Sequence, residues 1–203
     1  QATLNTPKGI FGNNVHAEYC TGKGFNITST EEVVFTNLVA SNNTGDGFYS
    51  LASDLTINGI ISQDNDGYGV QCDAGIVHIV GGRVRRNNLS GVCYANMDGG
   101  EIGGLTVDDS SEVPATYNAD IYLNSCTRCM IHHNSLLGNT ATGQADYNVV
   151  LHGGTLNLIN DNYLADQVQF TPIGSDSGAT YIARNNFPNV YVSSTNAEAI
   201  PVY

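Results

Sequence analysis

The chain has 203 residues, of which 41% are hydrophobic and 13% are charged, and its net charge is -12. So few long charged residues favour an all-β protein over a helical one, and the length suits a single domain. Only seven Lys and Arg residues are present. We therefore expect no nucleic-acid partner, which would need a basic surface, and no membrane insertion, because no apolar run approaches roughly 18 residues.

Taken in chain order, the sequence divides into a start, a repeated body and a tail. Residues 1–23 predict an irregular start or an incomplete first coil. Residues 24–192 repeat with a period of about 22 residues, most clearly in the copies Gly47–Gly69 and Gly69–Gly91. A unit this short cannot bury its apolar face alone, so the copies must stack into a solenoid. Residues 193–203 form a tail that we expect to continue into further chain.

Each repeat contains three short runs in which apolar and polar residues alternate. The first run predicts an inward column of Phe25, Phe48, Val70, Val92, Ile121, Val149, Phe170 and Val190. The second predicts Phe35, Ile57, Ile79, Ile102, Ile131, Leu158 and Ile182. The third predicts Val39, Ile61, Val84, Val107, Leu136, Tyr163 or Leu164, and Phe187. Three alternating strands per coil are typical of a single-stranded parallel β-helix.

Two other features of the repeat have structural interpretations. The turn after the third run carries Asn42–Asn43, Asp64–Asn65, Asn87–Asn88 and Asp108–Asp109, residues that suit left-handed turns and hydrogen bonds between coils.

The five cysteines are an odd number and do not form a disulfide pattern. Cys126 and Cys129 form a single CxxC followed by His132 and His133, which as strand neighbours should face opposite sides. We expect reduced thiols, no metal and no cofactor.

Two consecutive coils are longer than the others, and both insertions fall in the same turn. They are Asp108–Asp120 and Gly138–Asn148. Insertions on one flank of a solenoid are common positions for function, because they leave the core undisturbed. They should form one wall of a groove. Alternation places these polar and aromatic side chains on its floor: Tyr49, Gln71, Asp73, Tyr122, Asn124 and His152. Such a floor suits sugar rings, which combine apolar faces with hydroxyl edges.

Cleavage of a glycosidic bond needs a pair of carboxyl groups. The main candidates beside the groove are Asp73, Asp109, Glu112 and Asp120, with Glu101, Asp108 and Asp146 nearby. The alternative is that they are solvated residues of a generally acidic protein. His152 is a candidate acid, base or sugar ligand, or a simple surface histidine. Arg83, Arg85 and Arg86 form either an exposed edge or a site for an acidic sugar.

The repeated body resembles a known family. The coils GDGFYSLASDLTINGIISQDNDGYGV and GVQCDAGIVHIVGGRVRRNNLSGV resemble the right-handed parallel β-helix of the pectate-lyase-like superfamily, in particular the central domain of bacteriophage tailspikes. This resemblance implies a homotrimer on the virion tail that binds a bacterial surface polysaccharide and cleaves it. NNTGDG, VDDS and LHGG follow the order of the polygalacturonase motifs NTD, DD and GHG, whereas nothing matches RIK or the DPHE of alginate epimerases.

Three functions remain open at this stage. The first is a tailspike domain acting as an endoglycosidase, with hydrolysis favoured over elimination. Its catalytic carboxyls would be Asp73, Asp109, Glu112 and Asp120, and its sugar contacts Tyr49, Gln71, Tyr122, Asn124 and His152. The second is a non-catalytic β-helix that serves as a shaft or adhesin. The third is a secreted, monomeric polysaccharide lyase or epimerase. The enlarged loops favour a site, and the lack of an unmistakable acid pair favours a shaft.

Overall fold

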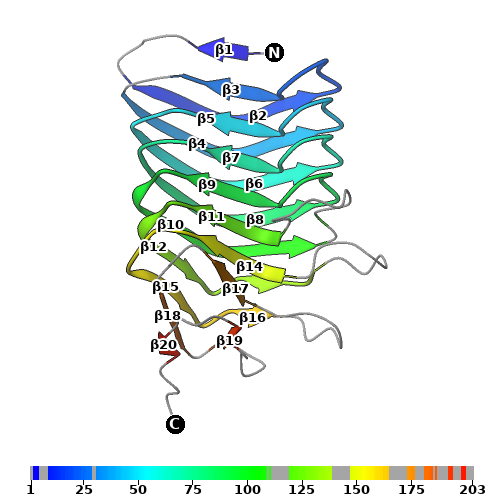
Figure 1. The fold of residues 1–203 in the computed structure, drawn as a ribbon. Coiled ribbons are helices and arrows are strands. Elements are labelled where there is room, and N and C mark those ends of the chain that lie inside the picture. Colours follow the sequence, from blue (N-terminus) through cyan, green and yellow to red (C-terminus); the bar gives the residue numbers. More distant parts are fainter. Residues whose placement is uncertain are drawn as a thin grey trace.

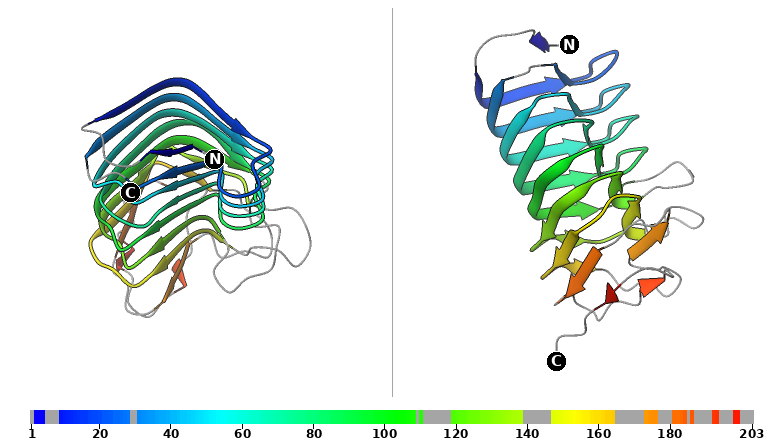
Figure 2. Two further views of the ribbon diagram at one scale, coloured as in Figure 1. Left: turned by 90° about the horizontal axis from the view of Figure 1, so that it is seen from above. Right: turned by 60° about the vertical axis from the view of Figure 1, so that its left-hand side comes forward.

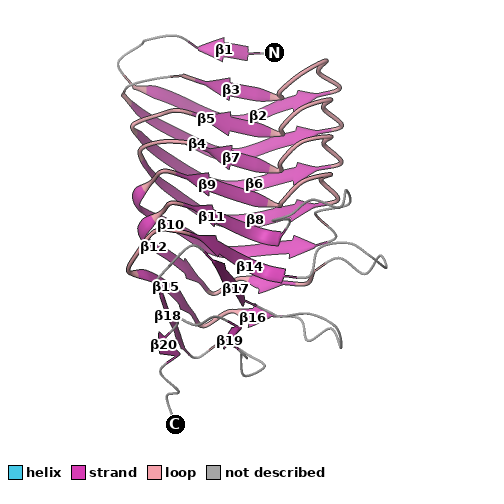
Figure 3. Ribbon diagram, viewed as in Figure 1, coloured by secondary structure: helices cyan, strands magenta, loops and turns pink. Residues whose placement is uncertain are grey.

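The structure is a computed structural model, which describes residues 2–4, 9–28, 31–108, 110, 119–138, 147–164, 173–176, 181–184, 186, 192–193 and 198–199. Within these residues the regular elements are strands, and none is a helix (Figure 3). The chain passes back and forth between two parallel sheets, so it winds in coils that stack on one another (Figure 1, Figure 2). The described residues contain no helix long and apolar enough to cross a membrane.

The first sheet has nine strands and is built from the first run of each coil. In spatial order they are β1 (Ala2–Leu4), β3 (Phe25–Ile27), β5 (Phe48–Ser50), β7 (Val70–Cys72), β9 (Val92–Ala95), β11 (Ala119–Asn124), β14 (Tyr147–His152), β17 (Ile173–Asp176) and β19 (Val192–Ser193). The pairings between them are parallel, and each joins one coil to the next.

The second sheet has eleven strands and carries the rest of each coil. Its main path is β2 (Ile10–Glu18), β4 (Glu32–Ser41), β6 (Asp54–Gln63), β8 (Ile76–Arg85), β10 (Asp98–Asp108), β12 (Thr127–His132), β15 (Asn157–Asn160), β18 (Tyr181–Arg184) and β20 (Glu198–Ala199). Two short strands complete it, β13 (Ser135–Leu136) and β16 (Tyr163–Leu164), and β13 pairs with both β10 and β16. Strands β1 and β2 fall within residues 1–23, for which the sequence predicted an irregular start or an incomplete first coil.

The predicted first inward column is confirmed over six coils. Its members lie in register and are at most 3% exposed: Phe25, Phe48, Val70, Val92, Ile121 and Val149. Phe170 and Val190 lie outside the described residues, and the register continues instead with Ile173 and Val192. The column faces the interior between the two sheets and forms one wall of the main hydrophobic core.

In the other two predicted columns, some inward positions are shifted by one residue along the chain. Ile131 pairs with buried Ile159, whereas Leu158 is only half-buried and pairs with Met130. Leu158 and Ile159 are both apolar, so the alternation of apolar and polar residues could not decide which of the two faces inward. Ile182 pairs with Leu158 and so belongs to a different column from the one expected. Phe187, the last expected member of the third column, lies outside the described residues.

A left-handed corner explains the error in the third column. Asn37 and Gly59 have φ values of 54° and 80°, and this turn shifts the in-out alternation by one residue. Val39 is therefore half-buried and Ile61 is 45% exposed, while the inward residues in register with Val84 are Ala40 and Ser62. Leu136 continues this column into buried Leu164, with Tyr163 exposed.

The corner also changes the expected three strands per coil. In the earlier coils the second and third runs pair continuously around it and form one bent strand, as in β4 and β6. They separate into two strands only in later coils, where β12 is followed by β13 and β15 by β16.

Buried asparagines stack along the turn between the two sheets, as the sequence predicted. Asn43 donates to the side-chain oxygen of Asn65 at 2.8 Å, and Asn65 donates to that of Asn87 at 2.9 Å. The third copy of the motif is Arg86–Asn87 rather than Asn87–Asn88, and the left-handed residue of that copy is Arg86. We call this stack the asparagine ladder. It satisfies polar groups that would otherwise be buried without partners.

The glycine that opens each coil is required by packing. A Cβ on Gly69 would lie 2.6 Å from the carbonyl oxygen of Gly91 and 2.5 Å from a methyl group of Val84. A Cβ on Gly47 would lie 2.3 Å from the hydroxyl of Ser62. Any larger residue would push neighbouring coils apart, which is why glycine recurs there.

All five cysteines are free thiols, and four of them are buried: Cys72, Cys93, Cys126 and Cys129. Cys72 occupies an inward position of the first sheet, as predicted.

Candidate functional site

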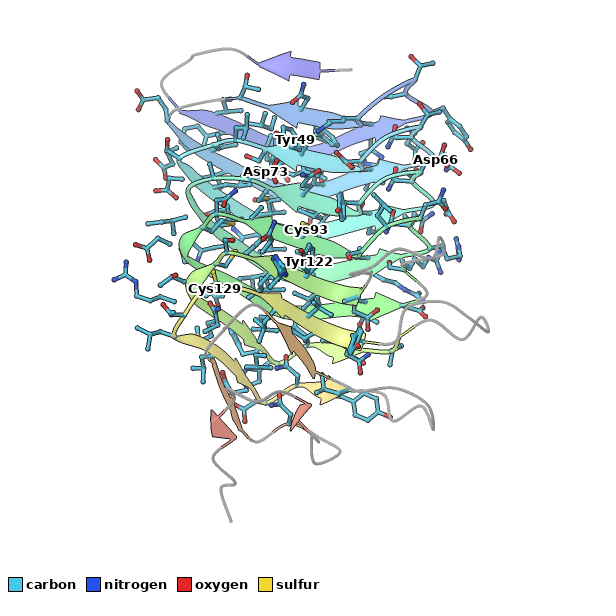
Figure 4. All side chains as sticks on the ribbon, viewed as in Figure 1. Tyr49, Asp66, Asp73, Cys93, Tyr122 and Cys129 are labelled. Carbon is cyan, nitrogen blue, oxygen red and sulfur yellow. The ribbon has the colours of Figure 1, made fainter. Side chains whose placement is uncertain are left out.

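The outer face of the first sheet carries the column of polar and aromatic residues that alternation predicted. Its members lie in register in successive coils: Asn26, Tyr49, Gln71, Cys93, Tyr122 and Val150. Figure 4 shows Tyr49, Asp73, Cys93 and Tyr122 following one another down this face. We call it the tyrosine face. It brings together most of the binding residues expected from the sequence.

The first part of the tyrosine face is polar. The amide of Gln71 donates to both carboxylate oxygens of Asp73, at 2.9 and 3.0 Å. Tyr49 lies one coil away, in register with Gln71. Burial, followed by the charge of Asp73 and a side-chain hydrogen bond to it, raises the pKa of Tyr49 above its ordinary value. Tyr49 therefore keeps its proton at neutral pH and offers a hydroxyl beside a carboxylate.

Lys23 and Asp46 complete this polar part, and the sequence interpretation missed both. The ammonium of Lys23 lies 3.0 Å from the ring centre of Tyr49 and 3.0 Å from a carboxylate oxygen of Asp46. Asp46 is buried and also accepts the backbone N–H of Tyr68 at 3.0 Å. A signal for them existed, because Lys23, Asp46 and Tyr68 each directly precede the glycine that opens a coil.

The second part of the tyrosine face is a small apolar cluster that is separate from the main core. Cys93, Tyr122 and Val150 are buried in it although they point outward, together with Ala119. Tyr68 and Tyr147 pack against them and are partly buried. Burial, with a smaller effect of Cys93 and Tyr122, raises the pKa of Tyr68 to about 12. This part of the face is uncharged and aromatic at neutral pH.

The ends of strands β11 and β14 place two more predicted contacts beside this cluster. Asn124 and His152 are in register one coil apart, and both are half-buried. The described part of the face thus combines tyrosine rings, amides, one imidazole and the carboxylates of Asp46 and Asp73. Among the described residues, no group of three or more His, Cys, Asp and Glu is arranged to hold a metal ion.

Comparison with known proteins shows a likeness in structure and none in sequence. No protein-family model and no curated protein sequence matches the chain. The A-module of the mannuronan C-5 epimerase AlgE6 of Azotobacter vinelandii has a similar structure, with a TM-score of 0.64 at 18% sequence identity. The likeness covers 92% of this chain and 58% of the epimerase chain. The fold is of the parallel β-helix type. At this identity the likeness shows the fold alone.

The β-helix gives Asp120 a structural position. Its carboxylate is buried, and one oxygen accepts the backbone N–H of Gly138 at 2.9 Å and the side-chain amide of Asn148 at 2.8 Å. These bonds join the two coils that carry the enlarged loops. Asp109 and Glu112, the other loop candidates, lie outside the described residues.

Glu101 lies on the other sheet of the β-helix, away from the tyrosine face. Its two carboxylate oxygens lie 3.1 Å from Nδ1 of His78 and 2.7 Å from Nε2 of His132. Partial burial raises the pKa of Glu101, but the hydrogen bonds with His132 and His78 outweigh it, so the net shift is downward. The expectation that His132 and His133 face opposite sides is wrong. His133 has a φ of 53°, which brings the two Nδ1 atoms within 2.8 Å.

Proposed function

We propose that the tyrosine face binds a polysaccharide. The observation that carries this proposal is a row of tyrosines beside the Gln71–Asp73 pair, in which Tyr49 and Tyr68 are partly exposed and Tyr122 belongs to the buried cluster that Tyr68 packs against. Tyrosine rings stack on the apolar faces of sugars, and amide and carboxylate groups bond to their hydroxyls. Tyr49 and Tyr122 are three coils apart, roughly 14 Å at about 4.8 Å per strand, which suits an extended chain.

The fold supports the same proposal. The similar epimerase module is named for a polysaccharide, mannuronan, and has the same type of fold. We infer that the β-helix is right-handed, since nearly all crossovers between parallel strands have that hand. The first sheet presents the tyrosine face over successive coils, and in the sequence the enlarged turns directly precede strands β11 and β14.

We further propose that the face processes the bound chain. Asp73 is the candidate acid or base, because it lies on the face beside the Tyr49 hydroxyl. The second carboxyl of a hydrolase would be Asp109 or Glu112. Asp120 is better explained as a structural residue, because Gly138 and Asn148 already occupy one of its oxygens.

A non-catalytic adhesin or shaft is the second candidate function. The observation in its favour is that the two carboxylates described on the face are both engaged, Asp46 by Lys23 and Asp73 by Gln71. For both candidate functions, the sequence resemblance supports a tailspike domain that forms a homotrimer on the virion tail. The alternative location is that of a secreted protein.

The test is binding and turnover of a panel of bacterial capsular and O-antigen polysaccharides by the Tyr49→Ala variant. We expect the affinity to fall about tenfold, the equivalent of one lost aromatic contact. Tyr163→Ala is the matched control, because Tyr163 is 46% exposed on the other sheet. Equal affinities of the two variants would place the binding surface elsewhere.

Turnover separates the two candidate functions. New reducing ends without an unsaturated product indicate hydrolysis, and an unsaturated product that absorbs ultraviolet light indicates elimination. Asp73→Asn should abolish either activity while binding persists. Binding without any turnover by the wild-type chain would support the adhesin instead.

A further inference from the structure

The distribution of basic residues bears on which polysaccharide the tyrosine face can take. The chain has seven, Lys8, Lys23, Arg83, Arg85, Arg86, Arg128 and Arg184. Lys23 is the one that the described residues place on the tyrosine face, and its ammonium is already bound to Asp46 and to the Tyr49 ring. The buried carboxylate of Asp46 therefore already balances the charge of this ammonium, and an anionic sugar would compete with Asp46 for it.

The central arginines are directed elsewhere and have partners of their own. Arg83 and Arg85 are in β8 of the second sheet, where Arg83 binds Asp108 at 2.6 Å and Arg85 donates to Gln63 at 3.0 Å. Arg86, in the turn that follows, makes two bonds to Asp64, at 2.6 and 2.8 Å. The earlier hypothesis that these residues bind an acidic sugar at the groove is therefore not supported by their position.

Arg128 is likewise removed from the face. It belongs to β12 in the second sheet and makes two bonds to Asp98, at 2.8 and 2.5 Å. Both of these side chains are more than 60% exposed, so solvent screens the pair. Arg184 belongs to β18, also in the second sheet.

The two enlarged turns contribute acidic residues and no basic ones to the chain. Residues 109–118 and 139–146 contain no Lys, Arg or His, and they contain Asp109, Glu112 and Asp146. Asp73 adds a carboxylate on the face itself, paired with an amide and not with a cation. The Asp73 carboxylate would repel an anionic group bound beside it, because their separation would be shorter than the Debye length of about 8 Å at physiological salt.

We propose that the tyrosine face takes an uncharged, hydroxyl-rich polysaccharide and rejects polyuronates and other polyanions. The inference rests on the proposed function and names the substrate class of the same site. Sugar hydroxyls can donate to the Asp73 carboxylate, which has acceptor capacity beyond its bonds with Gln71. A neutral ring can lie on the partly exposed Tyr68 without bringing charge into the apolar cluster in which Tyr122 is buried.

The test compares glycans that differ only in charge. Each acidic polysaccharide of a bacterial panel is tested in its native form and after chemical reduction of its carboxylates to primary alcohols, together with natively neutral members. Affinity is measured by calorimetry at low and at physiological salt. We expect every bound glycan to be neutral or reduced, with the native acidic form at least tenfold weaker and improving as salt rises.

Two variants make the test specific to this face. Asp73→Asn should reduce, by several-fold, the ratio between the affinity for the reduced glycan and the affinity for its native acidic form. The control Asp54→Asn removes one negative charge from an exposed position on the second sheet and should leave the difference unchanged. A native polyanion that binds more tightly than its reduced form, and loses affinity as salt rises, would overturn the inference and leave the proposed function intact. Failure of every polysaccharide to bind would overturn both.

Discussion

At the scale of single residues, Glu101 shows how the stacking of coils creates charge networks. Glu101 belongs to β10, His78 to β8 and His132 to β12, so one carboxylate joins three successive coils. His132 lies over Gly103, where a Cβ would come within 2.7 Å of the imidazole. The glycine therefore makes room for the ring that approaches Glu101.

This network predicts a pH-dependent contribution to stability. The folded pKa of Glu101 is lowered, so the unfolded chain binds the proton more tightly and deprotonation favours folding. The contribution is complete above the ordinary glutamate pKa of about 4.3 and is lost as the pH falls through that value and the lowered one. Glu101→Gln should cost roughly 0.5–1 kcal/mol at pH 6 and little at pH 3, measured by urea unfolding.

The control for this prediction removes the cause of the shift. In a His78→Ala and His132→Ala background, the groups that lower the pKa of Glu101 are absent. Glu101→Gln should then lose its pH-dependent cost. A cost that keeps the same pH profile in this background would show that another group is responsible.

At the scale of the elements, the asparagine ladder ties the turns of successive coils together. The side-chain oxygen of Asn65 accepts both the backbone and the side-chain N–H of Asn43. Its amide donates to Asn87, to the hydroxyl of Ser62 and to the carbonyl of Ala40. One buried side chain thus satisfies groups in three coils.

Replacing Asn65 by Ala should therefore destabilise the β-helix by about 2–4 kcal/mol. The variant leaves several buried donors and acceptors without partners, each worth about 1–3 kcal/mol, and partial relaxation or water entry recovers some of this. Chemical unfolding measures the change. Asn58→Ala is the matched control, because Asn58 is exposed on β6, and it should cost less than about 0.5 kcal/mol. Equal losses at both positions would contradict the ladder's role.

At the scale of the whole molecule, the two sheets present different outer faces. The first carries the tyrosine face. The second exposes large apolar side chains on strands β2, β6 and β8: Phe11 at 72%, Ile61 at 45%, Ile76 at 47% and Val80 at 40%. Exposed apolar side chains of this size are candidates for a contact with another chain. A homotrimer joined through the second sheet would leave the tyrosine face open to a polysaccharide.

Sedimentation equilibrium of the chain should accordingly give three times the mass of one chain at micromolar concentration. The double variant Ile61→Asp and Ile76→Asp should shift the mass to that of a monomer, because it places charges in the apolar contact. Leu156→Asp, at an exposed position outside that sheet's strands, should leave the trimer intact. A wild-type chain that stays monomeric at every concentration would contradict the homotrimer and favour the monomeric enzyme.

The sequence alone determined the repeat, the stacked coils, the first inward column and the outward column with Tyr49, Gln71 and Tyr122. These follow from period-2 alternation counted from a glycine that opens each coil and that packing requires. The tertiary structure decided the rest. Left-handed corners at Asn37 and Gly59 shift the in-out alternation by one residue. The period-2 pattern of the sequence does not predict that shift.

The side-chain contacts between neighbouring coils could also not be predicted from the sequence. Lys23 meets Asp46 across 23 residues, and Glu101 meets His132 across 31, because stacking brings them together. Local alternation specifies which side of a strand a residue faces. Which residues of the neighbouring coils meet there depends on the length and corner geometry of each coil, and only the folded chain sets these.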